Sequence, residues 1–174
     1  MIFKSTMLVD YRFLIGEIFN SLRIIRELNS DQKFEFPDIT DVIFSAIESL
    51  HENMNVDVYI YHETSEEDEV QHLNGLIQTK NEIRIKVTTV SNDYYSVEIA
   101  KDIERKAKTD SIILVVGDDP VYEHSIIDSI DKAKIKVLRK SNDESSYDQV
   151  KSLCRYQDIH YAIGSAMELP IHMI

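Results

Sequence analysis

The sequence predicts an α/β fold, a doubly wound and mainly parallel five-stranded sheet with helices on both faces. The residues Ile112–Val116 are all apolar and run directly into Gly117, which is typical of a strand buried on both faces. Strand-like and helix-like segments alternate along the chain without an internal repeat. A length of 174 residues with 43% apolar content suits one buried core. We therefore expect a single domain over residues 1–174.

Local patterns predict each element in turn. Leu14, Ile18 and Leu22 recur at helical spacing, which indicates the first helix. Pro37 and Asp38 open a second helix, and residues 56–61 alternate between apolar and polar as a half-covered strand does. The predicted strands are 5–9, 56–61, 83–90, 112–116 and 135–138, and the predicted helices are 11–28, 37–50, one capped by Thr64 or Ser65, 93–108 and 120–132.

Charge and composition limit the function. Acidic residues outnumber basic ones 31 to 19, and the net charge of −12 opposes nonspecific attraction to nucleic-acid phosphates. Any nucleic-acid site must then be a local basic patch. Cys154 is the one cysteine, which excludes an internal disulfide and a multi-thiolate metal site. The first apolar run is too short for a signal peptide or a membrane span, so we expect a cytoplasmic protein.

Three carboxylates are predicted at the ends of strands. Asp10 ends the first strand, Asp93 opens the helix after the third, and Asp118 ends the fourth. If the strand order is 3-2-1-4-5, Asp10 and Asp118 face each other where open α/β sheets bind ligands. Such close like charges repel unless a cation lies between them. Only oxygen ligands are present, which favours Mg²⁺ or Mn²⁺.

Two more acids next to this position have open alternatives. Asp119 precedes Pro120, so it is either a metal ligand or the N-cap of the following helix. Glu123 lies on the buried-side arc of that helix, where it is either a further ligand or a partner of the helix dipole. The acidic run at residues 66–69 is interpreted as the first turn of a helix, where carboxylates favour the dipole.

A basic stripe is the candidate RNA surface. Lys101, Arg105 and Lys108 are spaced so that they share one face of a helix, and Arg139 with Lys140 follows the last strand. The alternative is a solvated helix face on which Glu98 and Glu104 are the partners of these cations.

The order of these features resembles a known family. The segments that carry the resemblance are MLVDY, SNDYYSVEIAKDI, IILVVGDDPVYEHSIIDSI and KIKVL. Together they look like the NYN domain, a branch of the PIN-like metal-dependent ribonucleases, over about residues 5–161. The resemblance implies a PIN-like sheet of order 3-2-1-4-5, hydrolysis of RNA with Mg²⁺ or Mn²⁺, and catalytic ligand roles for Asp10, Asp93 and Asp118. The chain departs from the family pattern at Phe13, Val116 and Pro120.

Two hypotheses of function follow. The first is a metal-dependent endoribonuclease in which Asp10, Asp93 and Asp118, helped by Asp119 and Glu123, hold the cation that activates water against a phosphodiester of single-stranded RNA. The alternative is a catalytically silent PIN-like module that binds RNA or a protein in a regulatory assembly. The apolar tail, residues 162–174, packs either on the core or on a second copy in a homodimer.

Overall fold

A computed structural model describes residues 3–48, 54–139 and 155–174, and it confirms the α/β class. One seven-stranded sheet has the order β3-β4-β2-β1-β5-β6-β7, in which only the β3–β4 pair is antiparallel. The strands are β1 Phe3–Asp10, β2 Met54–His62, β3 Ile77–Lys80, β4 Ile83–Ser91, β5 Ile112–Val116, β6 Lys134–Arg139 and β7 Arg155–Asp158. The helices are α1 Tyr11–Leu28, α2 Ile39–Glu48, α3 Glu67–Val70, α4 Tyr95–Ala107, α5 Val121–Ser129 and α7 Ile159–Ala166, with short 3-10 turns at Thr64–Glu66, Gln71–Leu73 and Ile171–Met173.

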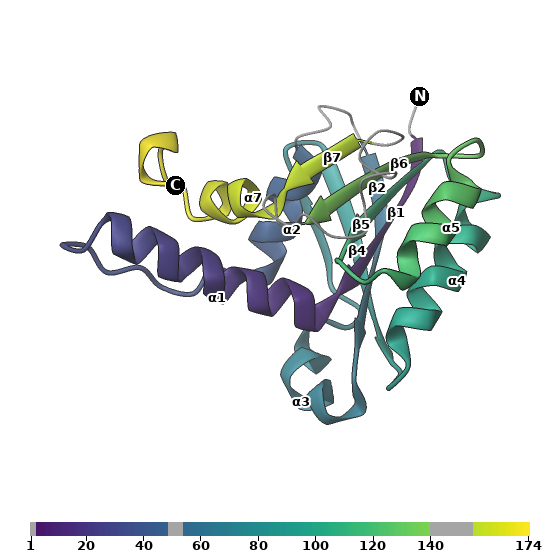
Figure 1. Ribbon diagram of the computed structural model, residues 1–174, viewed down its shortest axis with the longest axis horizontal. Coiled ribbons are helices and arrows are strands. Elements are labelled where there is room, and N and C mark those ends of the chain that lie inside the picture. The colour runs from purple at the N-terminus through teal and green to yellow at the C-terminus, as the bar shows by residue number, and fades with distance from the viewer. Residues whose placement is uncertain (1–2, 49–53, 140–154) are drawn as a thin grey trace.

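The helices form two layers around this sheet (Figure 1). α1, α2 and α7 cover one face, and α4 with α5 covers the other. Successive side chains of a strand point to opposite faces, so Met7 and Val9 of β1 join the first core while Leu8 joins the second. Of the described helices, none is long and apolar enough to cross a membrane.

The second face is covered over only part of its width. α4 packs on β1, β2 and β5, and α5 packs on α4. Farther out, residues 54–58 of β2 and 83–87 of β4 bury alternate side chains and leave the others in contact with water. Val56 and Ile85 are buried in the first core, whereas Asn55, Arg84 and Lys86 are exposed. We call this uncovered part of β2 and β4 the open face.

The structure corrects several predicted elements. β3 and β7 extend the sheet beyond the five predicted strands. The third predicted helix is broken into two 3-10 turns around the four-residue α3. α4 begins at Tyr95, so Asp93 lies in the preceding loop and does not open the helix.

The tail packs on its own chain. The Nδ1 atom of His160 lies 2.8 Å from the hydroxyl oxygen of Ser21 in α1, and its Nε2 lies 3.1 Å from the carbonyl oxygen of Ile174. The side-chain amide of Asn29 donates to the carbonyl of Met173 at 3.1 Å. These contacts join the end of the tail to α1 and α7 of the same chain, and packing on a second copy stays a prediction.

Candidate functional site

Asp10 is the most buried of the predicted site carboxylates described here. It ends β1, next to β5, and its side chain is the N-cap of α1. Its Oδ1 accepts a hydrogen bond from the backbone N–H of Phe13 at 3.1 Å, and its Oδ2 accepts one from the hydroxyl of Tyr122 at 3.0 Å. Asp10 is only 6% exposed, and this burial raises the pKa of its carboxyl group above the ordinary value.

Tyr122 reaches Asp10 because Gly117 leaves room for its ring. A Cβ atom on Gly117 would lie 2.7 Å from Cε2 of Tyr122 and 3.5 Å from Cβ of Asp10. Burial raises the pKa of the Tyr122 hydroxyl far above neutral pH, so this group stays protonated and remains a donor. The glycine in the loop after β5 thus allows the hydrogen bond from Tyr122 of α5 to Asp10, which caps α1 on the other face of the sheet.

Two further carboxylates act on Asp10 electrostatically. Asp119 and Glu66 both raise the pKa of Asp10, after the larger effect of burial. Asp119 also accepts a hydrogen bond from the N–H of Val121 at 2.9 Å, although the N-cap position of α5 is Pro120 and not Asp119. Glu66 belongs to the acidic run that was interpreted as helix-dipole residues. Its approach to Asp10 was missed because nothing local in the sequence reports it.

Asp118 has a protein cation beside it. Its Oδ1 lies 3.6 Å from a guanidinium nitrogen of Arg139 in β6. The Arg139 side chain is 0% exposed and that of Asp118 is 16% exposed, so the pair is largely out of water. The guanidinium of Arg139 is thus buried in this structure, which does not favour the predicted contact between Arg139 and RNA.

Asp93 and Glu123 have surroundings of their own. The carboxylate of Asp93 accepts a hydrogen bond from the N–H of Thr64 at 2.9 Å, and this bond lowers the pKa of Asp93. Asp93 therefore ties the loop after β4 to the turn after β2. Glu123 is half-buried in the first turn of α5, the position that its dipole alternative requires.

A shared metal site needs several of these side chains to converge on one point. Among the residues that the structure describes, no group of three or more His, Cys, Asp or Glu side chains is close enough to hold a metal ion. The five predicted ligands therefore do not form such a group in the described part of the chain, and the Mg²⁺ or Mn²⁺ site stays a prediction. Each of Asp10, Asp93, Asp118 and Asp119 has a partner from the protein instead.

The predicted basic stripe on α4 is exposed and partly paired. Lys101 lies 3.8 Å from Glu98, and Arg105 lies 2.6 Å from Asp102. Lys108 is exposed just after the helix, and Lys140 lies outside the described residues. The pairing agrees with the alternative of a solvated face, although Asp102 takes the place of Glu104 as the second partner.

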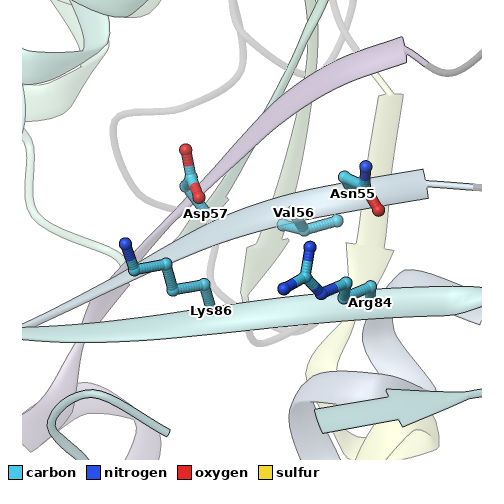
Figure 2. Close-up of a pocket in the computed structure, with 5 residues that line it drawn as sticks. All are labelled: Asn55, Val56, Asp57, Arg84 and Lys86. Atoms are coloured by element: carbon cyan, nitrogen blue, oxygen red, sulfur yellow. The ribbon is translucent and has the colours of Figure 1, made fainter. Parts of the chain in front are cut away.

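The open face holds polar residues that the sequence reasoning did not select. A cavity of about 230 Å³ is lined by Asn55, Val56 and Asp57 of β2 and by Arg84 and Lys86 of β4 (Figure 2). The signal was present, because the segments 55–59 and 83–87 alternate between apolar and polar residues. It was interpreted only as a sign of strands.

Comparison with known proteins gives no assignment. The chain matches no family model, and no curated protein or solved structure compared with it is detectably similar.

A pH-dependent effect is expected from Asp10. Because its folded-state pKa is raised, the contribution of Asp10 to stability is fully present below the ordinary value of 3.8 and is lost as the pH rises through the raised pKa. Asp10→Asn keeps the cap and removes this loss, since asparagine also accepts the Phe13 N–H. We expect the melting temperature of Asp10→Asn, relative to that of the wild type, to increase between about pH 4 and pH 7.

Thermal melts of both proteins across this pH range measure the effect. Asp10→Ala is the control, because it removes the cap and is expected to cost about 1 kcal/mol even at low pH. If the difference in melting temperature between wild type and Asp10→Asn stayed the same at every pH, Asp10 would have an ordinary pKa.

Proposed function

We propose that the chain is a PIN-like domain that acts as a catalytically silent RNA-binding module. The observation that carries the proposal is the engagement of its strand-end carboxylates by the protein itself. Both oxygens of Asp10 accept hydrogen bonds, and the charge of Asp118 is balanced by Arg139. The order of the five predicted strands, β4-β2-β1-β5-β6, supports the PIN-like class because it is the order that the resemblance implies.

The chemistry of the two central acids supports the silent form. A carboxylate binds a divalent cation through ionised oxygen atoms. Burial favours the neutral form of Asp10, and Tyr122 occupies one of its oxygens with a proton donor. A cation placed beside Asp118 would also be repelled by the buried guanidinium of Arg139. The electrostatic need for a metal that the sequence indicated is thus met by side chains.

RNA is the proposed partner because two exposed cations lie side by side on an otherwise acidic protein. The net charge is −12, yet Arg84 and Lys86 are exposed and line the same cavity. A polyanion could be held only at such a place.

The metal-dependent endoribonuclease is the second candidate. It is favoured by one observation, the electrostatic effect of Asp119 and Glu66 on Asp10, which gathers three carboxylates at the carboxyl edge of the sheet. Mg²⁺ or Mn²⁺ bound among them would supply the activated water that such an enzyme requires.

A divalent-cation melt separates the two candidates. We expect millimolar MgCl₂ or MnCl₂ to leave the melting temperature unchanged, because the silent module binds no cation. A cation that did bind the folded state would instead stabilise it by about 2.7 kcal/mol at one hundred times its Kd and raise the melting temperature. We also expect no cation-dependent cleavage of single-stranded RNA. Differential scanning fluorimetry and a gel assay with end-labelled RNA measure the two effects.

The variants Asp10→Asn and Asp128→Asn make this experiment specific. Asp128 is exposed on α5 and is the matched control. A rise in melting temperature with Mn²⁺ that disappears in Asp10→Asn but persists in Asp128→Asn, together with RNA cleavage that follows the same pattern, would replace the silent module by the nuclease.

A further inference from the structure

The open face carries a compact set of polar side chains. Asn55 and Asp57 of β2 are the register partners of Arg84 and Lys86 of β4, so the four lie on the same side of two adjacent strands. Figure 2 shows them around the cavity of about 230 Å³, with Val56 between them. The contacts of α4 with the sheet are mainly with β1, β5 and β2, and Asn55, Arg84 and Lys86 are exposed.

The two cations of this set differ from most others in the structure. Arg84 and Lys86 are exposed, and among the described residues neither forms an ion pair or a side-chain hydrogen bond. By contrast, the cations of the predicted stripe, Lys101 and Arg105, each have an acidic partner on α4. An incoming anion would therefore break no existing ion pair of Arg84 or Lys86 among the described residues, although the carboxylate of Asp57 lines the same cavity.

Neighbouring side chains of β2 and β3 lie beside this set. Tyr59 follows Asp57 on the same side of β2, and the ammonium of Lys106 lies 5.2 Å above its ring. On the outer side, Ile77 of β3 is the register partner of Lys86 and is 51% exposed. The cations of the open face therefore have as neighbours a half-buried aromatic ring, which packs against the second core, and an exposed apolar side chain of β3. Proteins that bind single-stranded nucleic acids combine a cationic groove with aromatic side chains.

We propose that single-stranded RNA binds across the open face, with its phosphates at Arg84 and Lys86. This inference rests on the proposed RNA-binding function and gives it a site away from the carboxyl edge. Residues two apart on a strand are separated by about 7 Å, a distance close to that between successive phosphates of an extended RNA strand. Arg84 and Lys86 can therefore each hold one phosphate.

Asp57 and Asn55 favour RNA over other polyanions. The carboxylate of Asp57 is an acceptor in the floor of a basic site, and it repels an acidic peptide as much as it repels a phosphate. RNA can offset the repulsion between its phosphates and Asp57, because its 2′-hydroxyl can donate a hydrogen bond to the carboxylate. DNA lacks this donor. The amide of Asn55 offers both a donor and an acceptor to a base edge.

Fluorescence anisotropy with a labelled oligouridylate tests the site. The double variant Arg84→Ala/Lys86→Ala is expected to weaken binding about tenfold and to lower the slope of log K against log[salt] by about two. Its melting temperature is expected to stay near the wild-type value, because both side chains are exposed. The matched control Lys101→Ala/Arg105→Ala is expected to bind like the wild type. Asp57→Ala is expected to reduce the preference for RNA over the equivalent DNA.

The outcomes separate this site from the function on which it rests. If the wild type binds RNA and only Lys101→Ala/Arg105→Ala weakens it, the open face is the wrong site and the RNA-binding function stands. If the wild type does not bind RNA, both the site and the function are overturned. Binding of polyglutamate that depends on Arg84 and Lys86, without binding of RNA, would identify the open face as a surface for an acidic protein.

Discussion

Replacing Asp118 with alanine is expected to lower the free energy of unfolding by roughly 2–3 kcal/mol, toward the lower end for a buried ion pair because Asp118 keeps some contact with water. The loss arises at Arg139, because its guanidinium is 0% exposed and would lose a carboxylate neighbour. Urea denaturation followed by circular dichroism measures this change.

Two asparagine variants serve as controls for the role of charge. Asp118→Asn retains the shape of the side chain and loses the charge, so it is expected to be nearly as destabilising as Asp118→Ala. Asp119→Asn is expected to have a small effect, because asparagine also accepts the N–H of Val121. If Asp118→Ala were as stable as the wild type, the pair with Arg139 would have no structural role and Asp118 would again be available as a ligand.

Replacing Gly117 with alanine is expected to lower the free energy of unfolding by about 1–3 kcal/mol, the usual cost of overpacking a core. The added Cβ would lie 2.7 Å from a ring carbon of Tyr122, which is fully buried and cannot swing into water. The backbone is also held, because the N–H of Gly117 donates to the carbonyl of Leu138. Displacement of the ring would break the hydrogen bond to Asp10.

Gly16→Ala is the matched control for this substitution. Gly16 lies within α1, and an added Cβ there meets nothing within 4 Å. Alanine at this helical position is expected to raise the free energy of unfolding by about 0.5–1 kcal/mol. Chemical denaturation of the two variants under one condition gives the comparison, and an increase in stability for Gly117→Ala would show that Tyr122 does not need the space.

The best-predicted elements have strong local patterns. α1 spans Tyr11–Leu28 and β5 spans Ile112–Val116, as the apolar periodicity and the unbroken apolar run predicted. β3 was missed because all four of its residues are exposed and it joins the sheet mainly through backbone hydrogen bonds, which many sequences can form. The turn before β4 gives a weak signal as well, since Glu82 has a positive φ that is unusual for glutamate.

The candidate site was predicted in position but not in its contacts. The sequence correctly placed Asp10 and Asp118 at the ends of β1 and β5, which are neighbours in the sheet. It did not reveal that Tyr122 would donate to Asp10 from 112 residues away, or that Arg139 of β6 would lie beside Asp118. Such partners depend on how distant segments pack, and local spacing carries no record of that packing.

The partly covered sheet has a consequence for how the sequence can change. In residues 54–58 of β2 and 83–87 of β4, one set of alternate residues fills the first core, while the other set, Asn55, Asp57, Arg84 and Lys86, is exposed or half-exposed. A substitution in the second set alters charge and hydrogen bonding at the surface and leaves every buried contact in place. The residues that select a ligand on this face can therefore change during evolution while the packing of the core stays the same. β1 and β5 are buried on both sides, so substitutions there would change core packing.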